Sequence, residues 1–330
     1  MGLRFSALAI CLLMGFGCSS ATDTTPNDEP SSDSGIDPGV SNAQGPDSYF
    51  IAVHCDPNVT FPEEFLHLDT MVLAANEQNV KLTLMFTPQW VEYILGAPSR
   101  KDRFDFWVAS GHEIAMHHHS VYHPGTWDQY SDFEYDEYAP IMGFAKADNA
   151  EKLGDLDDLM ASLDTLHPGI KAGCANDEAD KSVMPDAVVK DTCSGFSNSY
   201  AYPVGTRAEG ADPLKSVNDF ALVGTTANGI ERRWLSHGMI SAPFIDATEL
   251  AFNEMNGGAH GVVIHTNDHD VSSLNSWLII LANYDQGAGS DTVSGILDGG
   301  TLPEETIDPA ILNAIYEESG KDKENGPPGP

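Results

Sequence analysis

Five of the twelve histidines in this chain lie in one short stretch, between His112 and His123. Residues 111–124 read Gly-His-Glu-Ile-Ala-Met-His-His-His-Ser-Val-Tyr-His-Pro. Ile114 and Met116 alternate with their neighbours, which predicts a short buried strand that ends at the histidines. Imidazoles grouped at the end of a strand are typical ligands of a divalent transition metal. His119 and His123 are four residues apart, but this spacing alone is a weak pattern. The alternative is therefore a solvated loop that is merely rich in histidine.

Two more apolar runs end in residues that could do chemistry. Ser48–Cys55 is followed directly by Asp56, and Ala259–His265 ends in a histidine. In an extended strand His54 and Asp56 point to the same side. The carboxyl ends of parallel strands meet at one edge of a sheet, so we expect these groups to converge with the first histidine cluster. A turn-capping Asp56 and a buried core His265 are the alternatives.

The histidine stretch resembles the metal-binding motif of the polysaccharide deacetylases, the NodB-homology group of carbohydrate esterases. That motif is Gly-His-Glu-Ile-x-x-His-Ser/Thr-x-x-His, and His119-Ser120-Val121-Tyr122-His123-Pro124 matches its second half. The spacing from Gly111 is two residues longer here, so His117 competes with His119 for the first ligand position. The resemblance covers about residues 48–285 and implies one bound divalent ion, zinc by expectation.

The resemblance also implies roles for the other strand ends. The first motif of the family has two aspartates, and Asp56 occupies the metal-binding second position. Cys55 stands where the family has its catalytic base, so Cys55 and His54 are the catalytic candidates here, with His54 or another nearby group expected to accept the proton. His265 matches the catalytic histidine that protonates the leaving amine. With Asp56, His119 and His123 as ligands, the implied reaction is attack of metal-activated water on an acetyl carbonyl.

The middle motifs of the family, an Arg-x-Pro strand end and an Asp-Trp pair, are not found in this sequence. The pair His54-x-Asp56 also resembles the zinc ligands of class II α-mannosidases. We therefore expect an exported metal-dependent deacetylase of an acetylated polysaccharide or peptidoglycan. The alternatives are a catalytically inactive glycan-binding lipoprotein of the same fold and a metal-dependent glycosidase.

Strand and helix patterns alternate along the chain, which predicts parallel βα units. The expected fold is α/β, an irregular (β/α)7-type barrel resembling the NodB-homology fold of glycoside hydrolases and deacetylases. The predicted strands are 48–55, 80–86, a run after Gly111, 170–175, 240–244 and 259–265, with short strands near Cys193 and Phe220. The first predicted helix has its start signal at Thr60–Glu63, with Pro62 inside, and its helical periodicity over 65–79. The other predicted helices are a stretch from Pro88 to near Pro98, 149–166, 184–190, 246–256, 272–284 and 309–318.

The N-terminal residues predict export. Residues 1–18 resemble a lipoprotein-type signal peptide with Cys18 as the lipid acceptor, and an ordinary secretory signal is the alternative. Residues 19–47 have too few apolar side chains to fold, so we expect a tether. The deacetylase-like barrel is expected to span 48–290, and 291–330 to form a peripheral helix and tail. The expected location is the bacterial cell envelope or the medium.

The net charge limits the partners that this protein can bind. With 16 Lys and Arg against 50 Asp and Glu, the net charge is −34. Such a charge disfavours nucleic acid and anionic bilayers, so we expect membrane contact only through a lipid anchor.

A disulfide between Cys174 and Cys193 could close a loop and stabilise the fold by about 3 kcal/mol, which would leave Cys55 free. The aromatic-rich stretch 125–144 is a candidate surface for stacking sugars, or simply a packed loop.

Overall fold

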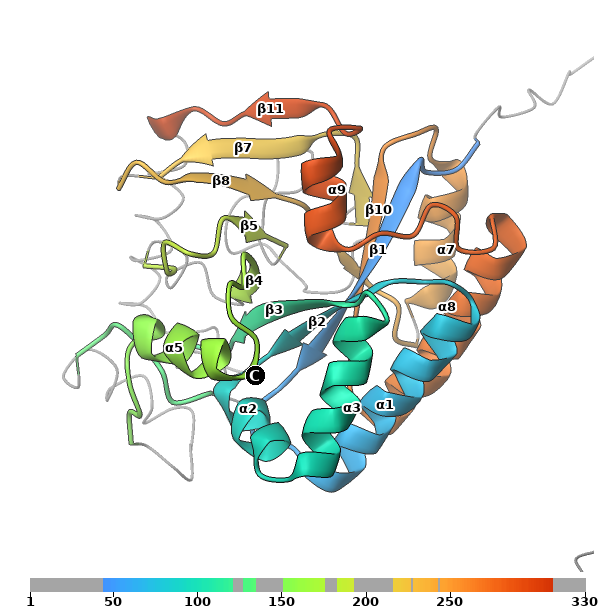
Figure 1. The fold of residues 1–330 in the computed structure, drawn as a ribbon. Coiled ribbons are helices and arrows are strands. Elements are labelled where there is room, and N and C mark those ends of the chain that lie inside the picture. The colour runs from blue at the N-terminus through green and yellow to red at the C-terminus, as the bar shows by residue number, and fades with distance from the viewer. Residues whose placement is uncertain are drawn as a thin grey trace, which may run out of the picture. The chain divides into compact units, whose positions relative to one another are not determined.

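A mostly parallel 11-stranded sheet forms the centre of the computed structural model (Figure 1). The structure describes residues 44–120, 127–134, 151–175, 183–192, 216–226, 228–242 and 244–310, all within the unit 41–330. The strands are β1 (Ser48–Cys55), β2 (Leu82–Phe86), β3 (Glu113–His118), β4 (Ala172–Ala175), β5 (Lys190–Asp191), β6 (Val217–Asn218), β7 (Ala221–Thr225), β8 (Glu231–Trp234), β9 (Gly238–Met239), β10 (Ala259–His265) and β11 (Glu304–Thr306). Their order is β11-β7-β8-β5-β4-β3-β2-β1-β10-β6, and β9 also pairs with β10.

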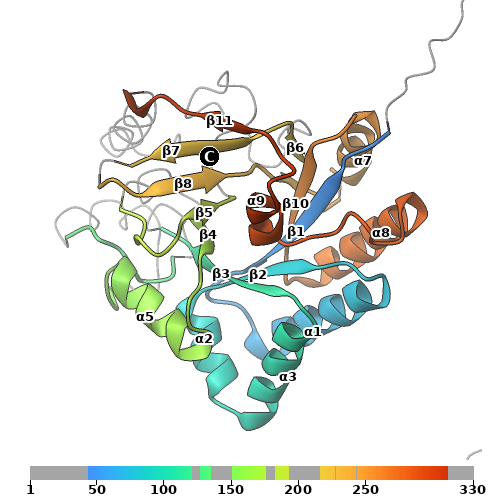
Figure 2. The same ribbon diagram turned by 45° about the horizontal axis from the view of Figure 1, so that its top comes forward.

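Seven helices belong to the described residues. They are α1 (Phe61–Glu77), α2 (Pro88–Leu95), α3 (Pro98–Ala109), α5 (Leu156–Leu166), α7 (Ile245–Glu254), α8 (Asp268–Tyr284) and α9 (Val293–Gly299). The first three carry a proline in the first turn, where its missing N–H costs no hydrogen bond. α5 begins with a capping box between Asp155 and Asp158. α1, α3 and α8 lie on the same side of β1 and β2 (Figure 2).

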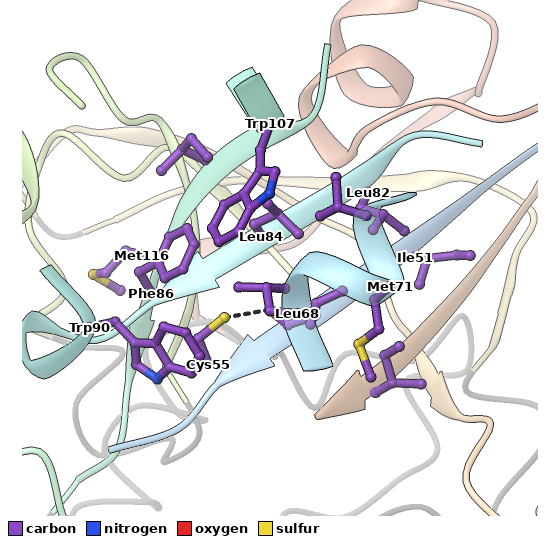
Figure 3. Close-up of a cluster of buried hydrophobic side chains, with 14 of the residues drawn as sticks. Ile51, Cys55, Leu68, Met71, Leu82, Leu84, Phe86, Trp90, Trp107 and Met116 are labelled. Carbon is purple, nitrogen blue, oxygen red and sulfur yellow. Dashed lines mark hydrogen bonds between the residues drawn. The ribbon is translucent and has the colours of Figure 1, made fainter. Parts of the chain in front are cut away.

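The central strand β1 separates two apolar clusters. It pairs in parallel with β2 on one side and β10 on the other, and seven of its eight residues are buried. Ile51, Val53 and Cys55 pack into the outer cluster, between the sheet and the helices (Figure 3). Phe50 and Ala52 belong to the inner cluster on the concave face of the curled sheet. Because side chains alternate along a strand, a strand buried on both faces reads as one continuous apolar run.

α9 fills the inner face near the amino ends of the strands. Val293, Ile296 and Leu297 are buried in the inner cluster. The Val293 N–H donates to Thr83 Oγ1 at 3.0 Å, next to the start of β2. In the same way, the N–H of the next residue donates to Glu113 Oε2 at the start of β3. The stretch 291–310, expected from the sequence to be peripheral, thus supplies a helix that packs inside the sheet and a strand, β11, that extends it.

The predicted irregular (β/α)7-type barrel is correct only as an α/β fold, because the observed sheet is open and does not close into a barrel. β8 has β5 on one edge and β7 on the other, while the remaining edge of β10 pairs with β6 and β9. With these edges occupied, β8 and β10 do not pair with each other within the described residues. Asn218 joins the two sides instead, donating to the carbonyls of Ser236 and Ala259 and accepting the Ser236 N–H.

The strands β1 and β10 begin and end at the predicted residues. The predicted helix at 184–190 is wrong, because this segment forms turns that lead into β5. The predicted strand at 240–244 is wrong as well, because the strand there is β9 at Gly238–Met239 and the described residues after it do not continue it. The elements α3, β8, α9 and β11 had no predicted counterpart, and most of the predicted helix 309–318 lies outside the described residues. None of the helices in the described ranges combines the length and apolar character that a membrane span requires.

Candidate metal centre

The carboxyl ends of β1, β3 and β10 bring the predicted chemical groups together. His54 and Asp56 lie two residues apart at the end of β1, so both side chains fall on the concave side. His117 and His119 have the same two-residue spacing at the end of β3. His265 ends β10 and lies opposite His54 in the parallel register. The predicted convergence of these strand ends is therefore present.

Asp56 lies between two imidazoles at the end of β3. Its Oδ1 is 3.1 Å from His117 Nε2 and 3.1 Å from His119 Nε2. Burial alone would raise the pKa of this carboxyl, but the hydrogen bonds from His117 and His119 outweigh burial and hold the pKa well below its usual range. Asp56 is therefore an anion at neutral pH.

The donor atoms of Asp56, His117 and His119 all lie within 4.8 Å of one another, a spacing that suits a shared metal ion. Two imidazoles and one carboxylate are a donor set that zinc and similar transition ions accept. Burial, reinforced by His119, lowers the pKa of His117 to about 3, so this imidazole is neutral, as a ligand must be. His117 Nδ1 is buried, with no hydrogen-bond partner in the described part of the chain. The residues present thus fit a metal ion.

A second group, His54, His117 and Cys174, also has donor atoms within 4.8 Å of one another. Cys174 is disulfide-bonded, however, and a disulfide sulfur is not the thiolate that binds metal. We therefore place the candidate ion at Asp56, His117 and His119. The predicted disulfide partner, Cys193, lies outside the described residues, while Cys55 is free, as predicted.

His265 lies beside the candidate ligands and is oriented from behind. Its Nε2 is 4.0 Å from Asp56 Oδ2, and its Nδ1 is 3.5 Å from Asp270 Oδ2. The same Asp270 oxygen accepts the His265 backbone N–H at 2.8 Å and the Asn267 amide at 3.2 Å. Asn267 in turn caps α8 by accepting the Asp270 N–H. The start of α8 therefore holds His265 with one ring nitrogen directed toward Asp56.

Two further imidazoles adjoin this group. The His54 ring lies 4.1 Å from the His117 ring and 5.5 Å from the rings of His237 and His265, centre to centre. Burial, followed by the neighbouring histidines, lowers the pKa of His54 well below its usual value. His237 lies between β8 and β9, and its Nδ1 is 2.7 Å from Thr192 Oγ1. No motif surrounds His237, and the strand before it, β8, was not predicted, so no sequence signal marked this residue.

Cys55 does not join the site. Its side chain lies in the outer cluster near Leu68 and Trp90 (Figure 3), on the opposite face of β1 from His54 and Asp56. Burial raises the pKa of its thiol well above its usual value. The catalytic role considered for Cys55 on sequence grounds is therefore at odds with its position in the core.

The structure places the remaining candidate residues from the sequence outside the metal centre or does not describe them. His123 and most of the aromatic-rich stretch lie outside the described residues. Trp127 is buried, and its indole N–H donates to the Tyr130 carbonyl at 3.0 Å, which fits a packed loop. His118, on the opposite face of β3 from His117, is fully buried against Asp128. Asp128 belongs to no sequence motif, so no sequence signal marks it.

Comparison with known proteins gives little further guidance. No protein family matches this chain, and no curated protein matches it. Among solved structures, the crystal structure of 4-alpha-glucanotransferase from Thermococcus litoralis is similar at a TM-score of 0.39 and 13% sequence identity. The matched region covers 78% of this chain and 39% of that protein. A TM-score this low establishes no shared fold, so the chemistry rests on the residues.

Proposed function

We propose that this protein is a metal-dependent deacetylase that acts on an acetylated polysaccharide, at an amide or ester acetyl group. One observation carries the proposal: Asp56, His117 and His119 meet as a ligand set, with His265 Nε2 4.0 Å from Asp56 Oδ2. A proton donor at the edge of a metal site can assist hydrolysis of an acetyl group by protonating the leaving group.

The residues of the site would have three different roles: metal binding, proton donation and proton acceptance. Asp56, His117 and His119 would hold one divalent ion, for which we propose zinc. When bound, such an ion supplies Lewis acidity, which polarises an acetyl carbonyl and makes water easier to deprotonate. His265, oriented by Asp270, would deliver a proton to the departing amine or alcohol. With Cys55 in the core, His54 and His237 are the further imidazoles that the described part of the chain brings near the site, and either could accept a proton.

The test is release of acetate from acetylated chitooligosaccharide and from peptidoglycan fragments, with and without a chelator. We expect chelation to abolish release and zinc to restore it. His265→Ala should keep its zinc and lose about 10²–10⁴-fold in turnover, because it removes only a general acid. His167→Ala, at the end of α5 and outside the site, is the matched control and should retain activity. If His265→Ala keeps full turnover, the proposed role of His265 is wrong.

A second candidate is a glycan-binding protein without turnover, and the position of Cys55 favours it. The residue preceding Asp56 is a cysteine, which has no carboxylate, and its side chain packs in the outer cluster away from the site. Binding of the oligosaccharide without acetate release would support this alternative. New reducing ends would instead indicate a glycosidase.

Export and lipid anchoring on Cys18 are part of the same proposal, because an envelope polysaccharide lies outside the cytoplasm. Residues 1–43 lie outside the described residues, so only the sequence supports this part. The net charge of −34 is compatible with a neutral or cationic glycan.

A further inference from the structure

Asp128 is a fully buried carboxylate directly behind the candidate metal centre. Its Oδ2 accepts a hydrogen bond from His118 Nδ1 at 2.7 Å and another from the His119 backbone N–H at 3.0 Å. Its Oδ1 accepts the Tyr130 N–H at 3.0 Å. A carboxylate without solvent is costly unless donors surround it, and here three N–H groups do so.

The backbone of Asp128 reaches the same neighbour. The Asp128 N–H donates to the His119 carbonyl at 3.1 Å, so one residue holds both backbone polar groups of His119. This matters because β3 ends at His118, which lies opposite Ala175 in the last register pair with β4. His119 therefore lies just beyond the ladder, and Asp128 holds it where strand pairing has ended.

Asp128 is itself anchored to a helix. Gln89, in the first turn of α2, donates its side-chain amide to the Asp128 carbonyl at 2.6 Å. α2 packs through Trp90, Val91 and Ile94 into the outer cluster. A continuous set of hydrogen bonds thus connects a rigid helix to the backbone of His119.

We infer that Asp128 is a positioning residue for the metal centre, one that fixes the His118–His119 backbone so that His119 Nε2 meets Asp56. The inference rests on the proposed function, since it assumes that His119 is a ligand. Residues that orient metal ligands typically contribute 10–100-fold to metal affinity. Asp128 would act through His119 and would not touch the substrate.

The test compares Asp128→Asn with Asp69→Asn. In Asp128→Asn, whichever way the amide is turned, its NH₂ group faces a backbone N–H, that of His119 or that of Tyr130. The substitution therefore breaks the hydrogen bonding without changing the volume. Asp69 is a matched control, because its carboxylate accepts from Arg103 and Trp107 on α3, outside the metal centre. Both variants should lose thermal stability.

The readout is the Kd for Zn²⁺, measured by competition with a chromophoric chelator, together with the visible spectrum of the Co²⁺-loaded protein. We expect Asp128→Asn to raise the Kd at least 10-fold and to change the Co²⁺ spectrum, with Asp69→Asn within twofold of the parent protein. Gln89→Ala, a milder change to the same anchor, should raise the Kd by a smaller factor and serves if Asp128→Asn does not fold.

Three results would overturn the inference. An Asp128→Asn or Gln89→Ala protein that binds zinc as the parent does would show that the contact does not position a ligand. If Asp69→Asn raises the Kd for Zn²⁺ as much as Asp128→Asn does, the weaker binding reflects a general loss of stability. If the parent protein binds no zinc, the proposed metal centre fails and the inference fails with it. If the parent protein binds zinc and Asp128→Asn binds it with the same affinity, only the inference about Asp128 is wrong and the proposed metal centre stands.

Discussion

The histidines of β3 have different roles although they are adjacent in sequence. His117 and His119 face Asp56, while His118 faces the buried carboxylate of Asp128. His112, before the strand, is structural: its Nδ1 accepts the Leu82 N–H and its Nε2 contacts Asn76 Oδ1. Strand alternation separates these roles, since successive side chains point to opposite faces.

At this scale the ligand set gives the first prediction. The sequence offered His117 and His119 as competitors, whereas the structure brings both within 3.1 Å of Asp56. We expect Asp56→Ala, His117→Ala and His119→Ala each to lower the zinc content of the purified protein strongly, because each removes one donor. Zinc is measured by mass spectrometry of the purified protein, with His167→Ala as the control. Full zinc retention in His117→Ala would leave His119 as the sole β3 ligand.

The second prediction concerns the buried His260, whose ring stacks on Trp277 and lies outside the site. Burial lowers the pKa of His260 to about 3, against about 6.5 in an unfolded chain. Between these values the unfolded state binds a proton that the folded state does not. The contribution of His260 is therefore fully present above pH about 6.5 and declines as the pH falls, by up to about 1.4 kcal/mol per pH unit.

Replacing His260 with phenylalanine keeps the aromatic packing and removes the titration. We expect His260→Phe to unfold at the same or higher urea concentration at pH 7 and to lose less stability than the parent between pH 6 and pH 4. Urea unfolding at four pH values measures the difference. Parallel pH profiles for the two proteins would contradict the assignment.

Among the elements, β1 shows most directly how alternation divides core from chemistry. Its odd-numbered residues Ile51, Val53 and Cys55 pack toward the helices, and its even-numbered His54, with Asp56 just beyond, faces the concave side. Residues 55 and 56 are adjacent in the family motif, but their side chains point to opposite faces of the sheet because side chains alternate along a strand.

The third prediction follows from this placement. Cys55→Ala should leave zinc content and any acetate release unchanged and should reduce stability by about 1–2 kcal/mol, because it removes one buried sulfur from the outer cluster. Cys55→Asp should be far more destabilising, since the carboxylate would be buried among apolar side chains. Thermal unfolding and the acetate assay report the two effects separately. A loss of turnover in a well-folded Cys55→Ala would return Cys55 to the site.

At the scale of the whole molecule, the amino and carboxyl ends of the strands differ in what covers them. α9 packs against the concave face near the starts of β2 and β3, whereas the polar groups of the site gather where β1, β3 and β10 end. The segment after residue 290 therefore completes the inner core, on the side away from the chemistry.

The fourth prediction is that a chain ending at residue 290 will not fold stably. It would expose the inner cluster that Val293, Ile296 and Leu297 cover, a loss of about 1.5–3 kcal/mol for each buried side chain. That sum is comparable to the total stability of a typical domain. A chain ending at residue 310 is the control and should unfold near the temperature of the full chain. Equal melting temperatures for the two truncations would show that α9 is dispensable.

The sequence alone determined the local features. The apolar runs predicted β1 and β10 to the residue, and Pro62 and Pro88 indicated the starts of α1 and α2. Histidine and aspartate at strand ends predicted a convergent site, because parallel strands must end at a common edge. The short strands β5, β8 and β11 carry too few residues for a periodic signal, so their pairing could not be read from the pattern.

Only the tertiary structure decided how these pieces combine. The sheet stays open because β7, β6 and β9 occupy the edges that barrel closure would use. His237 and Asp128 reach the site from segments more than 70 residues away from β1, and neither has a motif of its own. Their roles come from distances across the fold, which burial and hydrogen bonding set and which local sequence does not encode.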